Sequence, residues 1–195
     1  MRALPAMAKP MIRPVRLTLF AWLIALLSLP RAHAEETEVP PPFGLKWGES
    51  AERIEDAVRE ADAKIQERRK DTAGQEIWEI KGLAQTGLQR AYFHMSANKL
   101  VEVELQYSKD DWSPATYDEF MQRVRKRIED KYGPARLVAR QKEDGEHGVL
   151  KTLVGYRWDL GQTSVELYYF SAQDPKNLFR TLSLHYKAVS ATPAQ

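Results

Sequence analysis

Apolar and polar side chains alternate without interruption from Val101 to Tyr107, a stretch that reads Val-Glu-Val-Glu-Leu-Gln-Tyr. A period of two is that of a β-strand with one buried and one solvated face. The motif Val-Glu-Leu-x-Tyr starts at Val103 and returns at Val165. This repetition suggests a tandem duplication of one small unit.

Two segments show helical periodicity instead. The first follows Ser50, a suitable N-cap, and has Glu52 in its first turn, where a negative charge favours the helix dipole. Its apolar stripe consists of Ile54, Ala57, Val58, Ala61 and Ile65. The second begins at Ser113-Pro114 and stops at Gly133-Pro134. Its stripe consists of Phe120, Met121, Val124, Ile128 and Tyr132.

Seven segments have strand character: 75–83, 88–96, 100–107, 136–141, 149–160, 163–170 and 179–187. Strands joined by hairpins pair antiparallel, and two amphipathic helices can cover one face of such a sheet. The sequence therefore predicts an α+β fold in the order α-β-β-β-α-β-β-β-β. We expect an antiparallel sheet of about seven strands with both helices on one face. The basic run 68–70 and Gly74 are expected to close the first helical region.

Two hairpins allow the strand register to be predicted. In the first, a three-residue turn at 97–99 pairs apolar with apolar side chains, whereas a two-residue turn brings Tyr92 and His94 to that face. We prefer the former, which pairs Met95 with Val101, Phe93 with Val103 and Ala91 with Leu105. In the second, a two-residue turn at Gly161-Gln162 pairs Trp158 with Val165, Tyr156 with Leu167 and Val154 with Tyr169, and places Arg157 opposite Glu166 on the other face. The different turn lengths count against strict equivalence of the two units.

The first 34 residues have the features of a Sec-type bacterial signal peptide. A basic start precedes the apolar core Leu17–Leu29, and Ala32-His33-Ala34 forms a cleavage site before Glu35. The core is shorter than a membrane span, which needs about 20 apolar residues. We therefore expect a periplasmic or secreted protein with no membrane span after cleavage.

The domain organisation follows from these boundaries. We expect a signal peptide at 1–34, a proline-rich linker at 35–42, one α+β domain at 43–187 and a flexible tail at 188–195. Within the domain, 43–108 and 112–187 are the candidate repeats.

Charge and cysteine content narrow the function further. The leader contains five of the 29 basic residues and none of the 27 acidic ones, so the net charge changes from +2 to −3 on cleavage. Such a chain has no electrostatic case for binding nucleic acid. The absence of cysteine means that the core alone stabilises an exported fold.

Catalytic and metal motifs are sparse. The mature chain has no zinc-type histidine pairing and no Gly-x-Ser-x-Gly, and Ser96-x-x-Lys99 straddles a turn instead of opening a helix. We therefore expect no cofactor, no metal and, on balance, no enzyme. Glu102 and Glu104 with His94 are the one set that suits acid–base chemistry, as in a hydrolase of the cell envelope.

The aromatic residues are the remaining candidates for function. Large apolar groups fall on the face of the sheet that alternation predicts to be solvated, and two tryptophans precede the helices. This set consists of Tyr92, Leu153, Tyr168, Phe170, Trp47 and Trp112. Either other parts of the protein cover these side chains, or they form a surface that binds a ligand or partner.

One resemblance bears on these alternatives. The segment Gly48-Glu49-Ser50-Ala51-Glu52-Arg53-Ile54, a Gly-x-Ser that opens an amphipathic helix, resembles the start of small αβ modules in bacterial envelope proteins. The tandem order over most of the mature chain is similar in outline to beta-lactamase inhibitor protein. The resemblance implies a non-catalytic binding scaffold and transfers no functional residue.

The expected function is thus binding of another protein or an envelope component through the outer sheet face. The alternatives are the hydrolase described above and a carrier of a hydrophobic ligand, for which seven strands and two helices would form a half-open cup.

Overall fold

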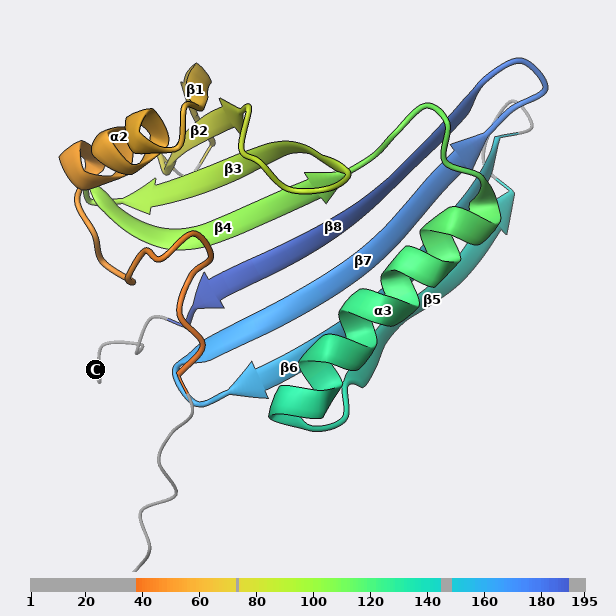
Figure 1. The fold of residues 1–195 in the computed structure, drawn as a ribbon. Helices are drawn as coiled ribbons and strands as arrows, with labels where there is room; N and C mark the ends of the chain where they lie inside the picture. Colours follow the sequence, from red (N-terminus) through yellow and green to blue (C-terminus); the bar gives the residue numbers. More distant parts are fainter. Residues whose placement is uncertain (1–37, 73, 145–148, 190–195) are drawn as a thin grey trace, which may run out of the picture. The chain divides into compact units, whose positions relative to one another are not determined.

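Two helices and eight strands make up the part of the chain that the computed structural model describes, which is residues 38–72, 74–144 and 149–189. The elements are arranged as Figure 1 shows. In chain order they are α2 (Ala51–Glu60), β1 (Lys64–Lys70), β2 (Glu76–Lys81), β3 (Leu88–Ser96), β4 (Lys99–Tyr107), α3 (Pro114–Tyr132), β5 (Arg136–Asp144), β6 (Leu150–Leu160), β7 (Thr163–Gln173) and β8 (Leu178–Ala188).

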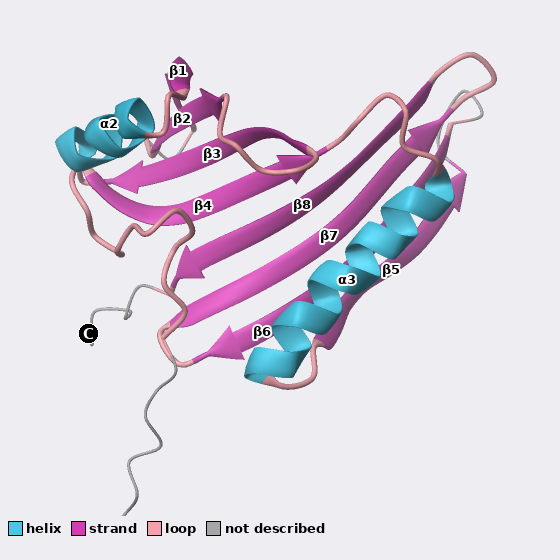
Figure 2. Cartoon of the chain, viewed as in Figure 1, coloured by secondary structure: helices cyan, strands magenta, loops and turns pink. Residues whose placement is uncertain are grey.

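The strands form one continuous sheet in the order β1-β2-β3-β4-β8-β7-β6-β5, and every neighbouring pair is antiparallel (Figure 2). The order α-β-β-β-β therefore occurs twice. Each half is a meander, and the last strands of the two halves, β4 and β8, pair from Glu102 opposite Lys187 to Tyr107 opposite Leu182. We call this β4–β8 pairing the central seam. The first strand of each half lies at an edge of the sheet.

The eighth strand, β1, corrects the prediction of seven. Residues 64–70 were expected within the first helical region and the turn after it, but the helix ends at Glu60 and Asp62 adopts a positive φ of 52°. Ile65 is consequently a strand residue. The sequence of β1, Lys-Ile-Gln-Glu-Arg-Arg-Lys, has one apolar position and no alternation. Charged side chains suit an edge strand, because they discourage pairing with another sheet, but they hide its periodicity.

The repeated Val-Glu-Leu motif does not mark equivalent strands. Val103 lies in β4, whereas Val165 lies in β7. In the repeated order the counterpart of β4 is β8, across the central seam. The repetition of element order is a property of the fold, but this motif is not its signature.

Both predicted hairpin registers are largely confirmed. Phe93 faces Val103 and Ala91 faces Leu105, but Met95 faces Leu100 instead of Val101. The turn has two residues, Ala97 and Asn98, both with positive φ as in the turns that two-residue hairpins favour. An irregularity between His94 and Met95 then restores the apolar pairing that a longer turn was expected to give.

In the second hairpin all four predicted pairs are present. They are Trp158 with Val165, Tyr156 with Leu167, Val154 with Tyr169 and Arg157 with Glu166.

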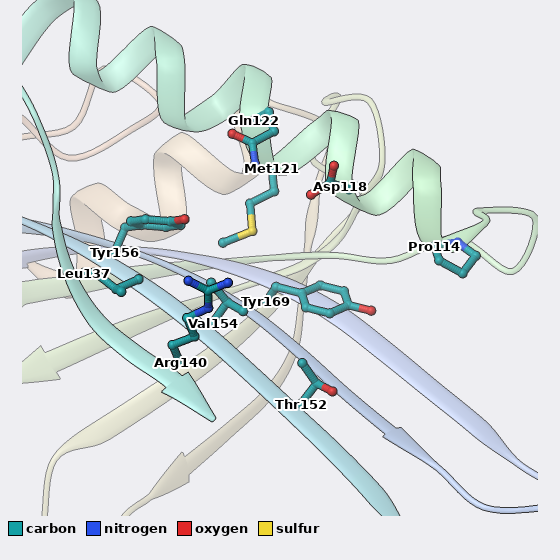
Figure 3. Close-up of a pocket in the computed structure, with 10 residues that line it drawn as sticks. All are labelled: Pro114, Asp118, Met121, Gln122, Leu137, Arg140, Thr152, Val154, Tyr156 and Tyr169. Carbon is teal, nitrogen blue, oxygen red and sulfur yellow. The ribbon is translucent and has the colours of Figure 1, made fainter. Parts of the chain in front are cut away.

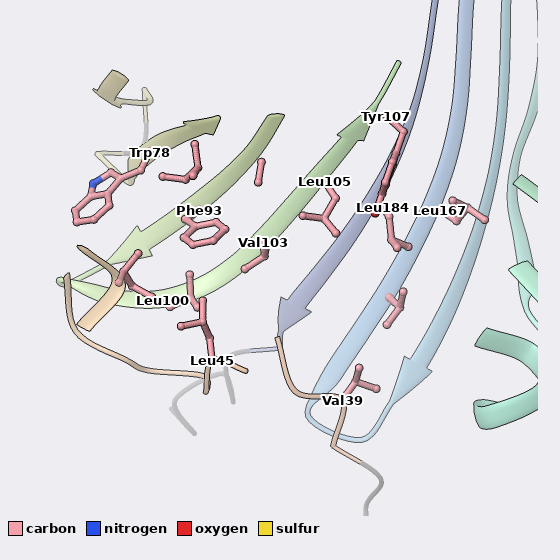
Figure 4. Packing of buried hydrophobic residues seen from close by; sticks show 14 of the residues in the cluster. Val39, Leu45, Trp78, Phe93, Leu100, Val103, Leu105, Tyr107, Leu167 and Leu184 are labelled. Atoms are coloured by element: carbon pink, nitrogen blue, oxygen red, sulfur yellow. The ribbon is translucent and has the colours of Figure 1, made fainter. Parts of the chain in front are cut away.

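The core lies between the sheet and the helices, on the side of Val103 and Val165. Helix α2 contributes Ile54, and α3 contributes Met121 and Ile128. Figure 4 shows the buried side chains following one another across the strands; among them are Trp78, Phe93, Val103, Leu105, Leu167 and Leu184. Both helices pack on this face, as the apolar stripes predicted. No helix in the described ranges is long and apolar enough to cross a membrane.

The segment before α2 is more ordered than a linker. Val39 is 3% exposed, its N–H donates to Oγ1 of Thr163 at 3.0 Å, and its carbonyl accepts from Nε1 of Trp47 at 2.7 Å. The predicted linker at 35–42 therefore contains a residue that packs on the domain, because one apolar side chain among the prolines docks beside β7. The signal peptide and most of the predicted tail lie outside the described residues. Ala188, expected in that tail, ends β8.

Candidate functional site

The face of the sheet that points away from α2 and α3 is the first candidate site, and we call it the outer face. Neither helix of the described residues covers it. Glu102 and Glu104 of β4 point to this side because they alternate with buried Val103 and Leu105. Ser183, His185 and Lys187 of β8 alternate in the same way with Leu182 and Leu184. The central seam therefore brings together polar side chains that lie far apart in sequence.

These side chains form one ionic network, the central cluster, which consists of Glu102, Glu166, Ser183, His185 and Lys187. Nδ1 of His185 lies 2.9 Å from Oε1 of Glu102, and its Nε2 lies 3.1 Å from Oγ of Ser183. Nζ of Lys187 lies 3.5 Å from Glu102 and 3.1 Å from Glu166. Glu166 is 6% exposed, although no described helix lies over it, because long neighbouring side chains surround its carboxylate.

Neighbouring groups of opposite charge favour the ionised forms of Glu102 and Lys187. Burial alone would raise the pKa of Glu102, but the hydrogen bond with His185 and the charge of Lys187 lower it overall. Burial would likewise lower the pKa of Lys187, but Glu102 and Glu166 raise it. The Glu102 carboxylate and the Lys187 ammonium group therefore remain charged near neutral pH.

His94 behaves differently. It faces Glu102 across the β3–β4 ladder, but its Nε2 is buried and makes no hydrogen bond within the described residues. Burial lowers the pKa of His94, and the charges of His185 and Lys187 add to this, while Glu102 and Glu104 oppose it. His94 is therefore neutral at pH 7.

We predict a stepwise loss of stability on acidification. Because the pKa of His94 is lower in the folded chain, the unfolded chain binds the proton first, and stability falls below the ordinary histidine pKa of about 6.5. The lowered pKa of Glu102 adds a second loss below about 4.5. Urea unfolding at several pH values should show both steps, and His94→Gln should remove only the first. If the free energy of unfolding of the His94→Gln variant falls between pH 7.5 and pH 5 as steeply as that of the parent chain, the assignment is contradicted.

The residues proposed for a hydrolase share the outer face but do not form an acid–base pair. Glu102 is engaged by His185 and Lys187, and Oε1 of Glu104 accepts from Nε2 of Gln106 at 2.7 Å. No hydrogen bond in the described ranges joins His94 to either carboxylate. The arrangement holds carboxylates in fixed positions and does not leave one of them free to act on a substrate.

The structure instead places Ser183, His185 and Glu102 in line, an arrangement that the sequence did not suggest. The two contacts have the lengths of a nucleophile–base–acid relay. However, β8 lies between β4 and β7, and backbone N–H groups of an inner strand are used by the two ladders. Acyl transfer also needs donors aimed at the developing oxyanion. The contacts therefore orient His185 and do not by themselves build a catalytic site.

The predicted partner-binding residues lie in three separate places. Leu153 faces Phe170 across β6 and β7, and Tyr168 packs edge-on against His185 with 5.8 Å between ring centres. Phe170 also contacts Phe179, which is 56% exposed. Leu153, Tyr168 and Phe170 thus lie together on the outer face beside the central cluster.

Tyr92 lies across the central seam, on β3, and is 8% exposed. Its ring is covered by the Arg69 guanidinium at 5.4 Å, and its hydroxyl accepts from Arg90 at 3.3 Å. Tyr92 therefore offers a partner little free surface.

The two tryptophans contribute to packing near the helices. Trp47 is fixed by its hydrogen bond to the carbonyl of Val39. Trp112 packs against Tyr117 and Phe120, with ring centres at 5.1 and 5.0 Å, and covers Gly87. This placement matches the role of a cap on the core edge, one of the two alternatives that the sequence left open.

A pocket of about 420 Å³ on the helix side of the sheet is the second candidate site (Figure 3). It lies between α3 and the strands β5, β6 and β7. Its wall is mainly apolar and aromatic, with Arg140 on β5 and Asp118 on α3 as the charged residues. The described residues contain no group of three or more His, Asp or Glu side chains that would suit a metal ion.

Comparisons with protein-family models, with curated protein sequences and with solved structures gave no significant match. They give no support to the resemblance to beta-lactamase inhibitor protein.

Proposed function

We propose that the protein is exported to the periplasm or secreted, and binds another protein or an envelope component through its outer face, without catalysis. The observation that carries this proposal is the central cluster. Its charged groups are paired and held in fixed positions on a face that no described helix covers.

Fixed charges on an open surface favour specific association. Complementary charges steer a partner and set its orientation, and groups that are already paired lose less entropy on binding. A flexible lysine or glutamate on a helix surface offers neither advantage. The outer face therefore has the electrostatic order that recognition requires.

Apolar side chains next to this cluster supply binding energy. Tyr168, Phe170 and Phe179 follow one another along β7 and β8, and Phe179 is 56% exposed. Aromatic anchors beside fixed polar groups are typical of the few residues that dominate the energy of an interface. We therefore place the centre of contact on β7 and β8.

Photo-crosslinking tests this proposal. A photoreactive amino acid at Phe179 should yield adducts with a partner from the native cell envelope, and the same group at Lys126 on the solvent side of α3 should not. The combined variant Tyr168→Ser, Phe170→Ser and Phe179→Ser should lose the adduct when the reactive group is at Thr181, which lies opposite Phe170 on the outer face. The proposal fails if Lys126 gives the same adducts, or if the combined variant keeps them.

The combined variant needs a control for folding, because Phe170 and Tyr168 are half-buried. Replacement of Glu119, Arg123 and Lys126 by serine removes three exposed side chains of α3 and no outer-face contact. Both combined variants should keep the circular dichroism of the parent chain.

A further inference from the structure

The pocket beneath α3 has a closed counterpart in the first half of the fold. In that half, Arg68 of the edge strand β1 lies opposite Trp78 and stacks its guanidinium 3.9 Å from the indole. The same guanidinium forms an ion pair with Glu55 of α2. The edge arginine thus has an aromatic partner beneath it and a carboxylate from the helix, and it closes the space between helix and sheet.

The second half has the arginine but lacks both partners. Arg140 of the edge strand β5 lies opposite Val154, a much smaller side chain than the indole. Within the described part of the chain, Arg140 makes no ion pair and no hydrogen bond with a side chain. Figure 3 shows its guanidinium directed towards the space below Met121. The pocket therefore lies at the position that the indole of Trp78 and the Arg68–Glu55 ion pair occupy in the first half.

The lining restricts what can enter. Met121, Val154, Tyr156 and Tyr169 form an apolar wall, and Leu137 beside it is 49% exposed. A volume of about 420 Å³ lies within the range of small-molecule sites. The guanidinium of Arg140 matches a carboxylate in geometry and charge. Asp118 on the opposite wall disfavours ligands with two or more negative charges.

We propose that this pocket binds a small monocarboxylate with an apolar body, of the fatty-acid type. Its carboxylate takes the position towards Arg140 that Glu55 takes towards Arg68, and its chain lies over Val154 below Met121. This site lies on the side of the sheet opposite the proposed partner surface, so neither proposal depends on the other.

Two ligands that differ only in charge test the proposal. Decanoate and decanol have the same alkyl chain, and calorimetric titration of the full mature protein should show decanoate binding about tenfold to hundredfold more tightly. Arg140→Gln should reduce the affinity for decanoate to that for decanol. Arg136→Gln on the same strand is the matched control, because its guanidinium pairs with Asp159 and does not line the pocket.

A second variant tests the comparison between the halves. Val154→Trp places an indole beneath Arg140, as Trp78 lies beneath Arg68, and should abolish binding of both ligands while the urea unfolding midpoint stays at or above that of the parent. The proposal is overturned if the parent binds neither ligand, binds both equally, or binds decylamine better than decanoate. It is also overturned if Arg140→Gln, with unchanged circular dichroism, retains the preference for decanoate.

Discussion

Replacing Trp78 by alanine should lower the free energy of unfolding by about 3–5 kcal/mol, the range for removal of a buried tryptophan. Trp78 is 1% exposed, and the change opens a cavity between β2 and α2. It also removes the surface on which Arg68 stacks and the donor to Glu76 at 2.7 Å. Thermal unfolding followed by circular dichroism should show a Tm lower by about 6–20 °C.

Two further variants separate the causes of this loss. Trp78→Phe keeps an apolar ring in the core and should recover more than half of the stability. Arg68→Ala removes only the stacked cation and its exposed ion pair, and should cost about 0.5–2 kcal/mol. A loss in Arg68→Ala equal to that in Trp78→Ala would show that the surface contact, and not the buried indole, stabilises the first half.

Replacing Glu166 by glutamine should lower the free energy of unfolding by about 2–3 kcal/mol. Glu166 is 6% exposed and faces Arg157 at 3.0 Å and Lys187 at 3.1 Å. Without the carboxylate, two cations remain close together on the outer face. The partner side chains are each 34% exposed, so solvent screens part of the effect and the loss stays below that of a fully buried pair.

An exposed ion pair provides the control. Glu119 pairs with Arg123 at 4.0 Å, and both side chains are about two-thirds exposed or more. Glu119→Gln should change the free energy of unfolding by less than about 0.5 kcal/mol in the same urea titration. If Glu166→Gln and Glu119→Gln have equal effects, the central cluster is ordinary surface charge, and the argument for a preformed binding surface fails with it.

Local pattern predicted the parts of this fold that local interactions determine. The turn at Gly161 set the β6–β7 register because one residue of slip would have turned Leu167 to the outer face and Glu166 towards the apolar core. The helix caps at Ser50 and Ser113 are also local, and both hydroxyls accept the expected backbone N–H. Strand β1 was not predicted, because the charged side chains that suit a sheet edge leave no alternation of apolar and polar residues.

The candidate sites depended on contacts that the pattern does not encode. Alternation placed Leu153, Tyr168 and Phe170 on one face, and the structure agrees. It also placed His185 on the polar side of its strand, but not beside Glu102, because no hairpin joins β4 to β8. The pocket at Arg140 could not be predicted from the pattern either, because it depends on the small size of Val154 beneath α3, a helix that is distant from it in sequence.

The central seam has a consequence for how the protein folds. Each meander is built from neighbouring strands and forms by short loop closures, whereas the seam joins Glu102 to His185, 83 residues away. Loop-closure entropy makes such distant pairings slow to form. We therefore expect the two meanders to form first and the seam to close last. A chain whose halves have not yet joined lacks the Glu102–His185 contact, so the central cluster is complete only when the seam has formed.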